Sequence, residues 1–163
     1  MLLKKALEKL QENKEFKNYT NKHKESFLSH AFTMVDKVQG SWQIGYCNPK
    51  TDKVIVFEID KEIDVKPEED IFKKPGQKVK PLDLSKVKLN LEQVMKITND
   101  LVEKNHSAEI VNKTIVILQN LGKNLYNLTL VCQSFNIINI RIDATSGEIL
   151  LETKQSIMGL RKE

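Results

Sequence analysis

Hydrophobic residues recur at helical spacing near the start of the chain. Leu3, Ala6, Leu7 and Leu10 stand at positions i, i+3, i+4 and i+7, with charged and amide residues between them. This spacing predicts a helix over residues 2–19. The period then changes: residues 27–36 are rich in aromatic and β-branched residues, residues 42–47 alternate, and residues 54–60 form an apolar run after a turn-forming stretch at 48–52. The first part is therefore predicted as a helix followed by a three-stranded antiparallel meander.

The same order of patterns returns later in the chain. Asn90 can cap a helix over residues 91–104, with Gln93 placed as in a capping box. Strands are predicted at 110–119, 126–132 and 137–143, and a short fourth strand at 149–153 after the turn at 144–148. Between the two parts, residues 61–89 contain Pro67, Pro75 and Pro81 and a dense mixture of charges, a composition typical of a surface connector.

The two parts align without a gap when residues 27–60 are placed over residues 110–143. This alignment pairs Ile55 with Ile138 and Asp60 with Asp143, although any two meanders would show some matching of period. We favour an internal repeat. The predicted fold is α+β, with two tandem helix-plus-antiparallel-meander units at residues 1–60 and 90–163, joined by a linker at 61–89. The sequence leaves open whether the units share one sheet, with both helices on one side, or pack as separate subdomains.

A short motif near the end of the chain carries a family resemblance. Residues 142–150 read Ile-Asp-Ala-Thr-Ser-Gly-Glu-Ile-Leu, which resembles the D-A-x-x-G-E-hydrophobic hairpin that closes PepSY domains, small α+β modules of peptidase propeptides and of many small bacterial and archaeal proteins. Asp143 can accept backbone N–H groups in the turn, and Gly147 supplies a positive φ. The first part resembles the module more loosely, through Trp42 and residues 54–60, and lacks the Gly-Glu step after Asp60.

Charge and composition narrow the choice of partners. The chain has 26 basic and 22 acidic residues, a net charge of +4, and its only arginines are Arg141 and Arg161. Because specific nucleic-acid recognition relies on the planar guanidinium, this balance argues against a nucleic-acid partner. We find no signal peptide and no apolar stretch long enough to cross a bilayer, and therefore expect a cytoplasmic protein with no membrane partner.

Residue types that carry chemistry are few and scattered. The chain contains His23, His30 and His106, and Cys47 and Cys132 lie in apolar runs without metal-binding spacing. Acidic residues gather at 60–64 and 68–70, where neighbouring lysines indicate a solvated segment. We therefore predict no catalytic residues, no metal site and no cofactor, and leave the binding residues open. A set of four aromatic residues is expected to pack the core, with a ligand pocket as the alternative: Phe32, Trp42, Tyr46 and Phe57.

These observations favour a non-enzymatic protein-interaction module. The PepSY-like resemblance implies binding or restraint of a peptidase or another protein, and the low charge of residues 110–140 suits a sheet surface that contacts a protein partner or a second copy of the chain. The alternative is a small-ligand-binding protein or enzyme that uses a pocket between helix and sheet, which requires convergent polar groups.

Overall fold

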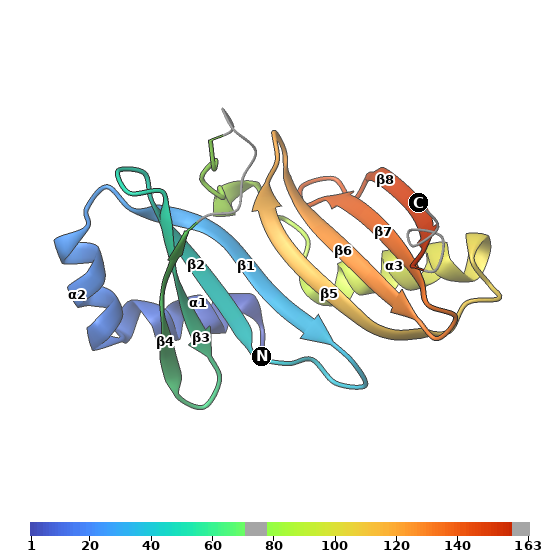
Figure 1. The fold of residues 1–163 in the computed structure, drawn as a ribbon, viewed down its shortest axis with the longest axis horizontal. Helices are drawn as coiled ribbons and strands as arrows, with labels where there is room; N and C mark the ends of the chain where they lie inside the picture. Colours follow the sequence, from blue (N-terminus) through green and yellow to red (C-terminus); the bar gives the residue numbers. More distant parts are fainter. Residues whose placement is uncertain (71–77, 158–163) are drawn as a thin grey trace.

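A computed structural model describes residues 1–70 and 78–157 of the chain (Figure 1). Pro75, Gly76 and Arg161 lie outside these residues. The elements, in chain order, are α1 (Leu3–Glu12), α2 (Lys14–Lys22), β1 (Phe27–Val35), β2 (Trp42–Asn48), β3 (Lys53–Ile59), β4 (Ile63–Asp70), the 3-10 helix η1 (Leu84–Lys86), α3 (Leu91–Asn105), β5 (Val111–Asn120), β6 (Asn124–Cys132), β7 (Asn136–Asp143) and β8 (Ile149–Ser156).

All the named strands belong to one eight-stranded antiparallel sheet with the order β4-β3-β2-β1-β5-β6-β7-β8. Strands β1 and β5 pair at its centre, where Ala31 stands opposite Leu118 and Phe32 opposite Ile117. The α+β class is confirmed, but the predicted architecture of two tandem helix-plus-meander units is wrong: the structure is one continuous sheet accompanied by short helices. Because β1 and β5 are separated by more than seventy residues of sequence, their pairing has no local signal that sequence periodicity could reveal.

The predicted helix over residues 2–19 is interrupted. It divides into α1 and α2 at Asn13, which has an extended backbone and whose side chain accepts a hydrogen bond from Phe16 N at 2.9 Å. Asn13 therefore ends one helix and caps the next, and the apolar spacing continues across the break. Helix α3 begins as predicted, since Asn90 and Gln93 form a capping box with both hydrogen bonds at 2.9 Å.

The segment predicted as a linker contributes to the sheet. Residues 63–70 form the edge strand β4, which pairs with β3, and Leu82 is buried in the core. Strand β4 is exposed along most of its length and contains Pro67, which a sheet accommodates at an edge because proline has no N–H to donate. A charged edge strand lacks the apolar alternation on which strand prediction depends.

The helices cover one face of the sheet and bury it. Phe16 of α2 contacts Tyr46 and Phe57 with ring centroids 5.1 and 5.4 Å apart, and α3 packs through Val94. The sheet side chains beneath them are fully buried, among them Ile44, Leu118, Leu128, Ile138 and Ile140.

The opposite side of the sheet, here called the open face, has a different character. Its side chains are half-buried, and no helix among the described residues packs on it. Phe32 was predicted to pack the core beside Trp42, yet it lies on the open face because it pairs with Gln43 and Ile117 and alternates with the buried Ala31. Trp42, Tyr46 and Phe57 lie on the helix-covered face, as expected for core aromatics.

Candidate functional site

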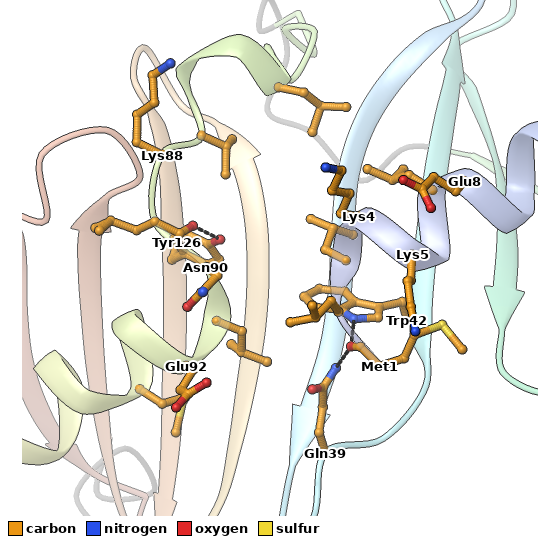
Figure 2. Close-up of a pocket in the computed structure, with 18 of the residues that line it drawn as sticks. Met1, Lys4, Lys5, Glu8, Gln39, Trp42, Lys88, Asn90, Glu92 and Tyr126 are labelled. Atoms are coloured by element: carbon orange, nitrogen blue, oxygen red, sulfur yellow. Dashed lines mark hydrogen bonds between the residues drawn. The ribbon is translucent and has the colours of Figure 1, made fainter.

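A large cleft lies on the helix-covered side, between the first turns of α1 and the start of α3. Its volume is about 1080 Å³. Figure 2 shows Met1, Lys4 and Trp42 on one side of the cleft, facing Asn90, Glu92 and Tyr126 on the other. We call this feature the interhelix cleft. Its apolar lining comes from the helices, from the segment around η1 and from the sheet: Leu3, Leu7, Val35, Leu84, Val87, Leu89, Leu91 and Met95.

The two aromatic residues at the cleft have their polar atoms already engaged. The Trp42 indole Nε1 donates a hydrogen bond to the Met1 carbonyl at 2.9 Å, and the Tyr126 hydroxyl donates to the Leu89 carbonyl at 2.6 Å. Burial raises the pKa of Tyr126 to about 12, so the phenol stays protonated at neutral pH. The floor therefore presents apolar ring surface rather than hydrogen-bonding groups that are available to a ligand.

The hairpin that resembles the PepSY motif holds one wall of the cleft. Asp143 Oδ1 accepts Thr145 N at 2.8 Å and Ser146 N at 3.2 Å, and these hydrogen bonds lower the pKa of Asp143. Gly147 adopts a φ of 81°. The predicted turn geometry is thereby confirmed.

The same turn also contacts the segment between η1 and α3. The Ala144 carbonyl accepts Lys88 N at 2.9 Å and Leu89 N at 3.1 Å, and the Thr145 hydroxyl donates to the Lys86 carbonyl at 2.5 Å. Leu89 and its neighbours are thus attached to the β7–β8 turn. This attachment fixes the position of the apolar side chains that they contribute to the cleft.

Charged residues of both signs surround the cleft. Lys4, Lys5 and Glu8 come from α1, while Lys88 and Glu92 come from the opposite wall. Three cations and two anions at the rim of an apolar groove suit an amphipathic occupant, whose apolar side enters the cleft and whose polar side stays near water.

The three histidines are positioned by different elements of the fold. His23 follows α2, and His106 follows α3 with its Nε2 at 2.8 Å from Glu152 Oε2. His30 packs against Gly45 on the open face, its Nδ1 is 2.9 Å from Ser29 Oγ, and burial lowers its pKa. None of them lines the interhelix cleft.

The remaining candidate groups do not line the interhelix cleft either. Cys47 and Cys132 are buried thiols, and the acidic residues at 60–64 and 68–70 belong to the exposed β3–β4 edge. Across the described residues, no group of three or more His, Cys, Asp or Glu side chains is arranged to hold a metal ion. None of the described helices has the length and apolar content to cross a membrane.

A second, smaller pocket of about 620 Å³ lies on the open face. His30, Gln43 and Val56 form part of its wall, together with charged residues of β4 and of residues 78–80. Its lining is more polar than that of the interhelix cleft, and the charges belong to exposed side chains at the end of the sheet.

The sequence predicts the elements to which several cleft residues belong, but not that these residues line one cleft. Trp42 is one of the four aromatic residues expected to pack the core, Tyr126 begins the strand predicted at 126–132, and Leu91 and Met95 fall within the helix predicted over residues 91–104. Their meeting depends on the β1–β5 pairing, which places the start of α1 beside the start of α3. The apolar residues around η1 lie in the predicted linker, where no periodic pattern marks them.

No family model matches this chain, and no curated protein matches its sequence. A likeness is found to a solved structure, described as a putative lipoprotein from Clostridium difficile 630. The two chains superpose with a TM-score of 0.55 at 16% sequence identity, over 86% of this chain and 90% of the other. At this level of identity the likeness concerns the fold alone.

Proposed function

We propose that this protein is a non-enzymatic binding module that takes an apolar segment of a partner protein into the interhelix cleft. The observation that carries the proposal is the cleft itself: about 1080 Å³ of apolar-lined space at which both aromatic polar atoms, Trp42 Nε1 and Tyr126 Oη, are bonded to backbone carbonyls.

The shape and chemistry of the cleft favour a peptide segment over a polar metabolite. A polar ligand needs converging donors and acceptors, and the polar groups at this cleft are either satisfied or long charged and amide side chains at its rim. An amphipathic helix lays its apolar side into such a groove through side chains at positions i, i+3, i+4 and i+7. Lys4, Glu8 and Glu92 are placed to pair with charges along its polar side.

The hairpin motif supports a protein partner. In the PepSY resemblance the module binds or restrains a peptidase or another protein, and here the matching turn, through Ala144 and Thr145, positions the cleft wall. A partner segment in the interhelix cleft would thus be held against the part of the chain that most resembles the family. The proposed binding site is therefore on the helix-covered side, whereas the sequence alone favours the sheet surface.

A small apolar ligand is the second candidate, favoured by the same lining. An acyl chain could occupy the cleft with its anionic head near Lys4, Lys5 or Lys88. The two candidates differ in what displaces a fluorescent probe from the cleft.

The test uses the dye 8-anilinonaphthalene-1-sulfonate as the probe, displaced in turn by amphipathic helical peptides and by palmitate. We expect the dye to bind the wild-type protein, and the peptides to displace it while palmitate does not. Displacement by palmitate alone would replace the protein-binding proposal with the ligand-binding one. Absence of dye binding would contradict both.

A matched pair of variants locates the binding. Leu84→Glu places a negative charge in the cleft at a residue that is 41% exposed, and Leu121→Glu makes the same change outside the cleft at a residue that is 49% exposed. Because both side chains are already partly in water, neither variant is expected to unfold the protein. Because the dye is an anion, its affinity should fall for Leu84→Glu and stay unchanged for Leu121→Glu. Equal effects of the two variants would show that the dye binds elsewhere.

The cellular location of the protein belongs to the same proposal. We propose the cytoplasm, as expected from the sequence, while the description of the structural neighbour as a lipoprotein suggests attachment to a membrane surface. Fractionation of cells that express the full-length protein separates the two, since a lipid-anchored protein partitions into detergent and a cytoplasmic one stays in the aqueous fraction. Partition into detergent would overturn the cytoplasmic location and leave the cleft proposal standing.

A further inference from the structure

The open face carries a row of side chains whose chemistry is matched about the centre of the sheet. The row follows the strand pairing from β3 to β7, so its members lie side by side on neighbouring strands. They are, in order, Glu58, Gln43, Phe32, Ile117, Asn127 and Arg141.

The same types of residue follow one another outward on either side of the line between β1 and β5, here called the β1–β5 seam. The apolar Phe32 and Ile117 are nearest to the seam, the amides Gln43 and Asn127 come next, and the opposite charges Glu58 and Arg141 are third from it on either side. The two charged residues are five strand spacings apart, about 24 Å at the usual separation of strands. Glu58 and Arg141 are therefore too distant to pair within one molecule.

Both charged groups have capacity that the single chain leaves unused. Arg141 is half-buried on the open face, and its Nε, which the rest of the chain covers, has no hydrogen-bond partner among the described residues, so the terminal guanidinium nitrogens are the ones that a second copy would reach. Glu58 accepts hydrogen bonds from Ser41 and Gln43 through the same oxygen, Oε2, at 3.0 and 3.2 Å. Its carboxylate is thus held in place and remains able to accept from a guanidinium.

We propose that the open face binds a second copy of this chain, related by a two-fold axis that runs parallel to the strands along the β1–β5 seam. This operation exchanges the two sides of the row. It sets Glu58 of one copy over Arg141 of the other, Gln43 over Asn127, and Phe32 over Ile117, at the separation of about 10 Å that is usual for packed sheets. A two-fold interface has each contact twice, so the dimer holds two such ion pairs.

The charges select this axis over its alternative. A two-fold axis perpendicular to the strands, in the same plane and crossing the sheet along this row, would place Glu58 over Glu58 and Arg141 over Arg141, which costs free energy through repulsion. Either two-fold rotation keeps the hand of the sheet twist and leaves the two saddle-shaped surfaces parallel, so the charges alone distinguish the two axes. The neighbouring row strengthens the centre, since Met34 of one copy then lies over Ile115 of the other.

Sedimentation equilibrium across a range of protein concentrations tests the proposal, with single charge reversals and their combination. We expect wild-type protein to form dimers. Glu58→Arg and Arg141→Glu should each raise the dimer dissociation constant about 10-fold or more, because each creates two like-charge contacts. The double variant Glu58→Arg/Arg141→Glu should restore most of the affinity. Recovery of the affinity in the double variant is expected only if residue 58 of one copy contacts residue 141 of the other.

The controls separate association from folding. Lys104→Glu reverses a charge at an exposed residue of α3, on the opposite side of the molecule, and should leave the dimer unchanged. Circular dichroism and thermal unfolding identify any variant that loses its fold, and Glu58→Arg alone keeps the test valid if Arg141→Glu does not fold. A wild-type monomer at all concentrations, single reversals that dimerise like the wild type, or a double variant no tighter than the singles would each overturn the proposal. None of these results would bear on the interhelix cleft.

Discussion

Removal of the Tyr126 hydroxyl tests how much its hydrogen bond to the Leu89 carbonyl, in the wall of the cleft, contributes to stability. Tyr126 is 1% exposed, and its hydroxyl donates to the Leu89 carbonyl at 2.6 Å. Tyr126→Phe keeps the ring packing and deletes this hydrogen bond. A hydrogen bond is worth a net of about 1 kcal/mol, whereas a carbonyl left unpaired in the interior costs about 1–3 kcal/mol. Because Leu89 borders the open cleft, water can reach its carbonyl, and we expect a loss of about 1–1.5 kcal/mol.

Urea unfolding followed by the fluorescence of Trp42, the single tryptophan, measures this loss. The midpoint should fall while the dependence on urea stays unchanged, since the surface exposed on unfolding is the same. The matched control is Tyr19→Phe, because the buried Tyr19 hydroxyl makes no well-aligned hydrogen bond among the described residues and interacts only weakly with the Ser26 side chain. Its removal should be neutral or stabilising. Equal losses for the two variants would refute the assignment of the free energy to the Tyr126–Leu89 bond.

Further predictions concern pH and backbone conformation. Hydrogen bonds from neighbouring side chains lower the pKa of Glu109 from 4.5 to about 2. The ionised carboxylate should therefore contribute its full stabilisation above pH 4.5, and this contribution should be lost as the pH falls towards 2. In an acid titration of unfolding free energy, Glu109→Gln should lack the loss of stability that the wild type shows in this range. Gly147→Ala should lower the thermal unfolding midpoint more than Gly122→Ala. Both glycines have a positive φ, but of the two only Gly147 would bring a new Cβ against side chains, at 3.2 and 3.4 Å. Equal shifts of the two midpoints would contradict this steric explanation. Gly45→Ala places a Cβ within the His30 ring and should expel it, so that the lowered pKa of His30 returns towards 6.5 in an NMR titration; an unchanged pKa would show that the ring adjusts in place.

Local features were predictable from the sequence where all the groups that form the feature lie in one short segment. The capping box of Asn90 and Gln93 and the turn built by Asp143 and Gly147 are both present as expected. In each, the interacting groups lie within four residues of one another. The side chain and the backbone it bonds to therefore appear together in the sequence pattern.

Longer-range features were not predictable for physical reasons. The break at Asn13 leaves the apolar spacing intact, so the stripe from Leu3 to Tyr19 resembles one helix. Strand β4 carries charges and Pro67 because it has a neighbour on one side only, and its composition is that of a connector. The cleft arises from the pairing of β1 with β5, a contact between distant segments that leaves no periodic trace in either.

The composition of strand β4 also bears on how the sheet ends. An unpaired strand edge is a template on which another chain can add a strand and begin a fibril. At β4 an added strand would find no N–H at Pro67 and would have to desolvate Glu68 and Asp70, all exposed. The charges and the proline that make β4 resemble a connector in the sequence therefore also disfavour aggregation through this edge of the sheet.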